Sequence, residues 1–396
     1  AQVGTGSIGR SPLLFHSPDL EPFVDDLPRP QVLTGESVAV TARTGSHRFH
    51  RDLPEAMTLG YNDSGYLGPT IEAHSGVRTT LTYHNEITAH PHAADIDTSL
   101  HGATEETRTH VPTSLHLHGG VTEPASDGHP EQLSRPGQGH VHHFDNRQDA
   151  TGLWYHDHAM PITRLNVYGG LAGGYLLRDR WDTGRADNPL GLPAGEYEIP
   201  LVMQEKIMNA DGSASIRSTP IVPRGRWEGG AVGDVGVVNG KIWPTAEVAR
   251  GLYRLRMVNA ASFSNWILRF SKPLDMWVIG MEGGLLPAPA KTDHLRLAPG
   301  ERADVLVDFS PLAAGETVEL VNTEPAAPQA AQIGAVHLPT LMRFRATAAR
   351  GHAGPVPDTL RGGAGQPPAL APLAKPAAVR NVSLSQPSDI RIPPSM

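Results

Sequence analysis

Cysteine is absent from the 396 residues, so the chain can form no disulfide bond and offers no thiolate to a metal. Lysine and arginine number 33 against 41 acidic residues, and the net charge of −8 argues against a nucleic-acid partner, which requires a concentrated basic face. The longest apolar run, residues 167–177, is broken by glycines and is shorter than the roughly 18 residues that span a bilayer. The first residues lack the basic and apolar regions of a signal peptide. These absences favour a soluble protein, with the cytoplasm as its expected location and no membrane partner.

Glycine and proline are abundant, at 42 and 36 residues, as expected for many short strands joined by turns. Apolar side chains recur at every second position, for example at Leu81 and Tyr83 and again at Val305 and Val307. Sustained helical periodicity is hard to find. The sequence therefore predicts an all-β fold.

Two histidine pairs carry most of the functional information: His116, His118, His156 and His158. Because residues i and i+2 of a strand point to the same face, each pair presents two imidazoles side by side, and two neighbouring strands would bring all four together. The intervening Leu117 and Asp157 are expected on the opposite face, Leu117 in the core and Asp157 against polar partners. This pattern predicts a metal site.

Four neutral imidazoles with no thiolate nearby favour copper or zinc, and the histidines alone do not choose between these metals. One such pair is usually a strand with two polar residues on its solvated face. Two pairs within about forty residues, the second preceded by Trp154 and Tyr155, are much more specific. We expect Trp154 and Tyr155 to pack beside the site and exclude water.

Other histidines and methionines match no ligand motif. We expect surface positions for His140, His142 and His143, and a solvated polar loop around His90 and His92. Without a cysteine to complete a copper site, methionines are better explained as core residues; those considered are Met160, Met203 and Met281.

The histidine pairs lie in a longer stretch, residues 113–179, that resembles the first copper-binding region of bacterial multicopper oxidases, closest to the phenoxazinone synthase and spore-coat laccase branch. The resemblance continues through residues 68–71, 238–241 and 297–309, and covers nearly all of residues 10–345. It implies tandem cupredoxin-like Greek-key β-sandwich domains, of which this chain matches the first two of three. The remaining ligand motifs of that family, including the one that holds its cysteine, have no counterpart here.

A faint internal repeat supports two domains of like topology. The sequence after Pro69 echoes the sequence after Pro244, with Gly76 and Asn85 matching Gly251 and Asn259. The residues after 345 are rich in alanine, proline and glycine, a composition typical of linkers. The expected boundaries are an N-terminal extension at 1–29, cupredoxin-like domains at 30–180 and 181–345, a linker at 346–380, and the start of a truncated third domain at 381–396.

The resemblance also implies roles for single residues. His116 matches the ligand of the type 2 copper, and the type 3 pair takes His118, His156 and His158. Asp127 matches an acidic residue that helps to deliver protons during oxygen reduction, although a turn-capping aspartate explains the sequence equally well.

The resemblance thus implies a copper-dependent oxidoreductase that oxidises small aromatic substrates, of the o-aminophenol or phenol type, and reduces dioxygen to water. The chain would hold half of the trinuclear copper site and none of the type 1 copper ligands. A homo-oligomer, or association with a separate C-terminal domain, is compatible with this arrangement. Two alternatives remain open: a degenerate or truncated copper-binding or structural relative without oxidase activity, and a zinc hydrolase, which the β pattern disfavours.

Overall fold

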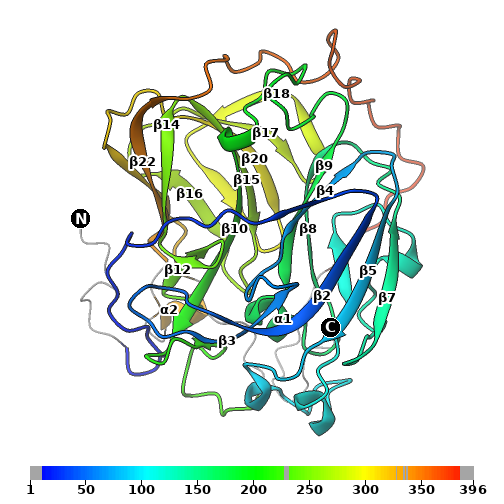
Figure 1. Cartoon of the computed structure of the whole chain (residues 1–396), viewed down its shortest axis with the longest axis vertical. Helices are drawn as coiled ribbons and strands as arrows, with labels where there is room; N and C mark the ends of the chain where they lie inside the picture. Colours follow the sequence, from blue (N-terminus) through cyan, green and yellow to red (C-terminus); the bar gives the residue numbers. More distant parts are fainter. Residues whose placement is uncertain (1–10, 227–231, 327, 333–334, 336–337, 384–396) are drawn as a thin grey trace.

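The computed structural model describes residues 11–226, 232–326, 328–332, 335 and 338–383. Strands dominate it, in agreement with the predicted all-β class, and they form two β-sandwiches (Figure 1). The helices are short: α1 (Thr163–Gly169), α2 (Pro328–Gln332) and the 3-10 turns η1 (Ala93–Asp95), η2 (Glu105–Arg108), η3 (Pro124–Ser126) and η4 (Gly195–Tyr197). Within the described residues, no helix has the length and apolar content that crossing a bilayer requires.

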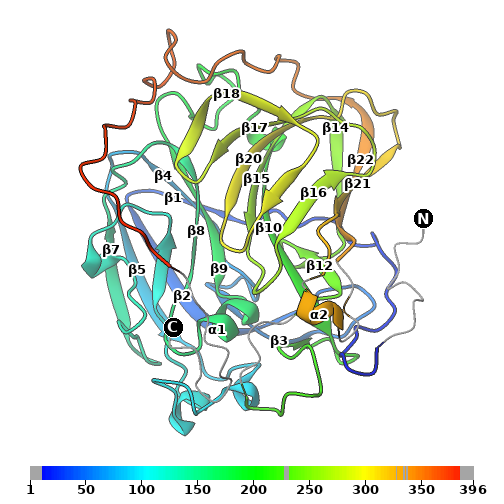
Figure 2. The same ribbon diagram turned by 180° about the vertical axis from the view of Figure 1, so that it is seen from behind.

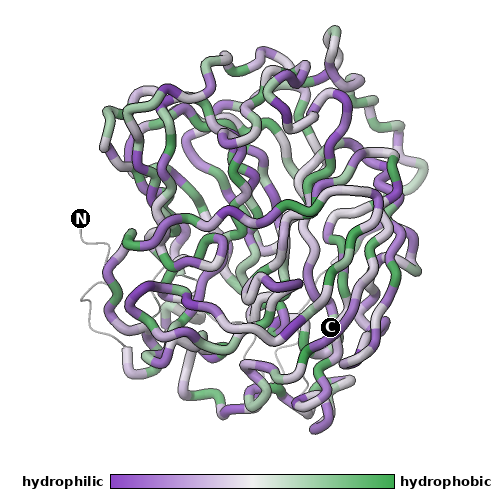
Figure 3. Tube along the Cα trace, in the orientation of Figure 1, coloured by the Kyte–Doolittle hydropathy of each residue, from purple (hydrophilic) through white to green (hydrophobic). Residues whose placement is uncertain are grey.

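The first sandwich is built from a five-stranded and a four-stranded sheet. The five-stranded sheet has the order β1 (Val32–Thr34), β4 (Thr70–His74), β9 (Ala172–Arg178), β8 (Thr151–Asp157) and β6 (Leu115–His118). The four-stranded sheet has the order β3 (Ala56–Tyr61), β2 (Ser37–His47), β5 (Thr79–Glu86) and β7 (Gly139–Phe144). Along β5 every second residue is buried, as the alternating sequence predicts. Figure 3 colours the chain by hydropathy and shows hydrophobic and hydrophilic residues interspersed along it.

The second sandwich pairs a five-stranded sheet with a larger one, seen from behind in Figure 2. The larger sheet has the order β13 (Lys241–Ile242), β12 (Val235–Val238), β10 (Glu198–Met208), β15 (Leu252–Asn259), β20 (Arg302–Asp308), β17 (Met276–Met281) and β18 (Gly284–Thr292), with β11 (Ala214–Ser215) paired to β10. The other has the order β14 (Thr245–Arg250), β22 (Thr340–Arg350), β21 (Thr317–Asn322), β16 (Trp266–Phe270) and β19 (Leu295–Leu297).

The two sandwiches repeat the same connections. In the first, β2 runs parallel to β5 and β4 parallel to β9; in the second, β10 runs parallel to β15 and β14 parallel to β22. Pro69 and Pro244 each stand directly before the equivalent strands β4 and β14. Asn85 and Asn259 share a role too: each side-chain amide donates to two backbone carbonyls, and its oxygen accepts the N–H two residues further on. The internal repeat therefore corresponds to equivalent structural positions.

Charged side chains are buried where the two sandwiches meet, at β9, β10, β15 and β20. The Arg254 guanidinium lies 2.6 Å from carboxylate oxygens of both Asp182 and Asp304. Arg178 and Glu198 form a second buried pair at 2.8 Å. Because buried ions require opposite charges around them, this network couples the orientation of one sandwich to the other.

Beyond the second sandwich, β22 runs to Arg350, so the first residues of the expected linker are part of a strand. Further along, Leu360 is fully buried in a cluster with Ile279 and Leu306, and Arg361 pairs with Asp149 of the first sandwich at 2.6 Å. Residues 384–396, most of the expected start of a third domain, and residues 1–10 lie outside the described residues. The domain boundaries therefore remain predictions.

Candidate metal centre

Two adjacent strands hold the predicted histidines. β6 and β8 pair antiparallel, with His116 opposite His156 and His118 opposite Trp154. His158 follows directly after β8, where its backbone N–H donates to the Ser114 carbonyl at 2.7 Å. The ring centroids of neighbouring histidines lie 5.2–5.9 Å apart. The structure thus places the four imidazoles of the two pairs side by side.

The donor atoms are close enough to share metal ions. His116, His118 and His156 each place one ring nitrogen within 4.8 Å of the others, and His118 Nδ1 lies 3.2 Å from His156 Nε2. His158 Nδ1 is buried and has no hydrogen-bond partner within the described part of the chain. Burial lowers the pKa of His118 to about 4, with Arg302 adding to the shift, and lowers the pKa of His156 and of His158. Neutral imidazoles are the form that binds a metal.

Backbone carbonyls orient two of the rings. His116 Nδ1 lies 2.6 Å from the Asp127 carbonyl oxygen, and His156 Nδ1 lies 2.7 Å from the Asp157 carbonyl oxygen. A ring that donates from Nδ1 to a carbonyl leaves Nε2 free for a metal, an arrangement common around metal-bound histidines. Asp127 therefore contacts His116 through its backbone; its half-exposed carboxylate lies 3.6 Å from the same ring nitrogen.

The residues between the histidines lie as predicted. Leu117 is buried in the core of the first sandwich. The Asp157 carboxylate is fully buried and accepts from the backbone N–H groups of Ser114 and Ala159 and from the side chain of Asn166, at 2.8–3.0 Å. Burial raises the pKa of Asp157 to about 7. These bonds fix the end of β8, from which His158 extends.

The expectation of a solvated loop at His90 and His92 was wrong, because both side chains are only 5% exposed. His90 Nε2 lies 3.0 Å from Asn166 Oδ1, and the Asn166 amide donates in turn to Asp157. The loop is folded under α1, so polar side chains meet each other there instead of water. The contact between His90 and Asn166 could not be predicted from the sequence, because the two residues are 76 positions apart.

The expectation of surface positions was also wrong for His142, which is buried on β7 and stacks on Phe144 with ring centroids 5.5 Å apart. His140 is partly buried and its Nε2 lies 2.8 Å from the Ala125 carbonyl, whereas His143 is exposed as predicted. Alternation along β7 places His142 and Phe144 on the inner face.

Trp154 packs beside the site as predicted: it stacks on His118 at 5.3 Å and lies 4.3 Å from His156 between ring centroids. Tyr155 instead points to the opposite face, where its hydroxyl donates to the Pro69 carbonyl at 2.7 Å inside the core. Strand alternation requires this separation, and the placement of Tyr155 beside the site was wrong. Of the methionines, Met203 is fully buried in the core of the second sandwich.

The second sandwich contributes two neighbours of the site that were not singled out from the sequence. Gly300, with φ +87°, is so close to His118 that an added Cβ would lie 3.0 Å from its Cε1. Arg302 donates to the Gly152 carbonyl at 3.3 Å and pairs with Glu282. Both residues belong to the 297–309 segment, whose resemblance to the family was the only feature of the sequence that pointed to them.

The donors of this cluster are imidazoles, two of which are oriented by backbone carbonyls and two of which pack against Trp154, and such donors fit copper or zinc. Together with two all-β sandwiches of like topology, it defines the class as a histidine-ligated metalloprotein with cupredoxin-like domains. Comparison with known proteins agrees. Residues 104–182 and residues 204–317 each match a family model described as multicopper oxidase.

Individual relatives show the same family. The chain is 36% identical over 325 residues to a laccase of Bacillus subtilis (strain 168), covering 77% of this chain and 62% of the relative. It is 35% identical over 345 residues to the multicopper oxidase LPR2 of Arabidopsis thaliana, covering 81% and 58%. This chain belongs to the multicopper oxidase family, which uses copper as its cofactor. It spans about 60% of the length of these relatives.

Solved structures agree on the fold. A laccase-like multi-copper oxidase, CueO, from Ochrobactrum sp. superimposes with a TM-score of 0.68 at 27% identity, covering 85% of this chain and 67% of the other. A multi-copper oxidase from Pediococcus acidilactici gives a TM-score of 0.68 at 26% identity, covering 93% and 67%. The cupredoxin-like fold predicted from the sequence is therefore confirmed.

Proposed function

We propose that this chain provides half of a trinuclear copper site to an oxidase that oxidises a small aromatic substrate, of the o-aminophenol or phenol type, and reduces dioxygen to water. The observation that carries the proposal is the convergence of four imidazoles from β6, β8 and the residue after β8. Similarity to laccases supports the reaction class. The choice of an o-aminophenol rests on the resemblance to phenoxazinone synthase alone.

In this proposal His116 holds the type 2 copper, and His118, His156 and His158 hold the type 3 pair. Bound copper supplies one-electron redox chemistry and a position for dioxygen. Trp154 excludes water from one side of His118, and the Asp127 and Asp157 carbonyls hold the rings in the ligating orientation. The Asp127 carboxylate, half-exposed beside His116, can receive protons from solvent and pass them toward the site.

Electron entry in such an oxidase requires a copper bound by a thiolate. The 396 residues contain no cysteine, so that ligand must come from a segment outside them. The matching third domain of a relative, supplied on the same chain or as a separate fragment, should restore both the blue Cu–thiolate absorption and oxygen uptake with o-aminophenol. The 396 residues alone should show neither.

Three outcomes would separate the candidates. Restored turnover that disappears in His116→Ala supports the proposal. Copper binding without turnover in the reconstituted protein would favour the alternative of a copper-binding relative that has lost oxidase activity. Robust turnover by the 396 residues alone would contradict the requirement for a thiolate copper.

A further inference from the structure

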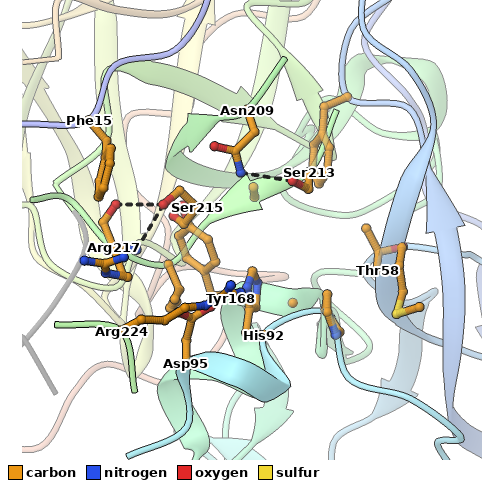
Figure 4. A pocket seen from close by; sticks show the side chains of 16 residues that line it. Phe15, Thr58, His92, Asp95, Tyr168, Asn209, Ser213, Ser215, Arg217 and Arg224 are labelled. Atoms are coloured by element: carbon orange, nitrogen blue, oxygen red, sulfur yellow. Dashed lines mark hydrogen bonds and ion pairs between the residues drawn. The ribbon is translucent and has the colours of Figure 1, made fainter. Parts of the chain in front are cut away.

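A cavity of about 260 Å³ opens near the end of α1, and none of the four site histidines lines it (Figure 4). Its walls come from the loop that carries His92, the end of α1 with Tyr168, the β10–β11 hairpin and the N-terminal segment at Phe15. Segments from distant parts of the sequence thus meet around one space. Its volume is close to the lower end of the range typical of small-molecule sites.

His92 is a buried polar group that faces this cavity. Its side chain is 5% exposed and lines the cavity, and the His92 backbone N–H donates to His90 Nδ1 at 2.9 Å. Its ring lies against Tyr168, with centroids 5.6 Å apart (Figure 4). Burial and nearby positive charges lower the pKa of His92, so the ring is neutral and offers one N–H donor and one acceptor. A ligand in the cavity can therefore form a hydrogen bond with this ring.

The charges around the cavity are mainly positive. Arg217 lines it, and Arg217 Nε is buried without a hydrogen-bond partner in the described part of the chain. Arg224 also lines it and pairs with Asp95 at 3.1 Å, which neutralises one charge. Lys206 lies behind Tyr168, with Nζ 3.6 Å from the ring centroid. Arg217 is thus a lining cation without an ion pair among the described residues, and its Nη2 donates to the Val222 carbonyl.

Part of the remaining wall is apolar, and the hydroxyl and amide side chains of Thr58, Asn209, Ser213 and Ser215 line the rest. The rings of Phe15, Phe49 and Tyr168 and the side chains of Met57 and Ile216 line the cavity, and the Arg217 guanidinium lies 5.3 Å from the Phe15 ring centroid. Aromatic walls favour a flat apolar body, and a guanidinium fork matches a carboxylate. The cavity therefore offers aromatic rings that can pack against a flat apolar group and a guanidinium that can bind a carboxylate.

We propose that this cavity binds a small aromatic carboxylate, with its carboxylate held by Arg217 and His92 and its ring packed against Phe15, Phe49 and Tyr168. The site is separate from the four-histidine centre and needs no metal. The proposal does not depend on the oxidase activity proposed above.

Benzoate is a suitable probe, and benzamide is its neutral match in shape. Titration calorimetry with the 396-residue chain should give one benzoate site per chain and binding of benzamide at least about tenfold weaker, since a charged hydrogen bond is lost. Free phosphate should compete poorly, because it lacks the ring. Equal binding of benzoate and benzamide, or no benzoate binding, would overturn the proposal; phosphate binding as tight as benzoate binding would overturn its aromatic part.

Two variants locate the site. Arg217→Met and His92→Phe should each weaken benzoate binding at least about tenfold. Arg345→Met removes an arginine from an exposed ion pair with Glu247 on the second sandwich and should leave binding unchanged. Retained binding in both site variants would place benzoate elsewhere.

A measurement on the unmodified chain keeps the proposal testable if a variant fails to fold. The ring nitrogens of His92 should shift in a ¹⁵N spectrum when benzoate is added, because one of them gains a hydrogen bond. Assignment uses the spectrum of His92→Phe, or, if that variant does not fold, of His92→Gln. An unchanged His92 resonance at saturating benzoate would contradict the assigned site.

Discussion

Lys206 shows what burial does to a single charge. Its ammonium is fully buried, donates to the Tyr168 carbonyl at 2.7 Å and faces the Tyr168 ring. Burial lowers the pKa of Lys206 to about 7. The unfolded chain, with a lysine pKa of about 10.4, binds more protons between pH 7 and that value, so stability rises with pH across this window. The cost of burying the charge is fully present below pH 7.

Replacing this lysine removes that pH dependence. Lys206→Met should be more stable than the parent chain by roughly 1–3 kcal/mol at pH 6, because it buries no charge, and this advantage should shrink toward pH 10.5. Glu205, whose pKa burial raises to about 7, titrates in both proteins and cancels in the comparison. Urea unfolding at pH 6, 8 and 10 measures the difference. A difference that does not change with pH would refute the titration of Lys206.

For single residues, the sequence predicts which face of a strand a side chain lies on, because side chains alternate between the two faces. The spacing of His116 and His118 predicts that both rings lie on one face, and the same alternation places Trp154 and Tyr155 on opposite faces. Burial of His92 could not be predicted, because it depends on α1 and the β10–β11 hairpin, which are distant in the sequence.

Among the elements, the turn η3 supports the site through one close approach. Gly128 follows it with φ +77°, and an added Cβ would overlap the Leu115 carbonyl oxygen of β6. This contact keeps the Asp127 carbonyl next to His116. Because Gly128 requires both the left-handed conformation and the space, glycine is needed there for the geometry of the metal site.

Gly128→Ala should therefore push η3 away from β6, lowering the free energy of unfolding by roughly 2–4 kcal/mol and weakening copper binding. The matched control is Gly137→Ala, at φ +84° but with no atom within 4 Å of the added Cβ, which should cost only about 1 kcal/mol and leave copper binding unchanged. Denaturant unfolding and copper titration of both variants check this. Equal effects of the two substitutions would mean that the contact with Leu115 has no role.

The sequence predicted that the secondary-structure elements are strands, but it predicted less well the residues at which single strands end. The alternation of residues such as Val305 and Val307 predicted strands that the structure contains. The end of β22 was missed because alanine-rich sequence after residue 345 has no strand signal of its own; pairing with β14 extends the strand. The residue at which a strand ends depends on the neighbouring strand in the sheet, and the local sequence does not reveal which strand that is.

For the whole molecule, buried ions at the junction of the sandwiches contribute to stability; Arg178 of β9 pairs with Glu198 of β10 across it, and Arg254 lies in the same network. Arg254→Met would remove the closest cation from Asp182 and Asp304 and leave Arg256 at 3.6–3.7 Å from both, so the chain should lose about 3 kcal/mol of stability. Arg345→Met, which breaks an exposed pair with Glu247, should cost less than about 1 kcal/mol. Urea unfolding at low and high salt tests both variants, and the Arg254 effect should persist at high salt because the pair is shielded from solvent. A loss below about 1 kcal/mol for Arg254→Met would contradict this role.

The arrangement of the sandwiches also determines what surrounds the site. Gly300 and Arg302 reach His118 from the second sandwich, across more than 150 residues of sequence. Local pattern could not place them, because their position depends on how two separately folded sandwiches pack. In the sequence, only the family resemblance of the 297–309 segment indicated that these two residues are important.

The most direct test of the central claim, that the four histidines at β6 and the end of β8 bind copper together, is the amount of copper held after equilibrium dialysis. The 396-residue chain and His143→Ala, which changes an exposed histidine on β7, should retain the same copper. The double variant His116→Ala and His156→Ala should retain little, because it removes facing ligands from both strands. Full copper retention by a folded double variant would contradict the site.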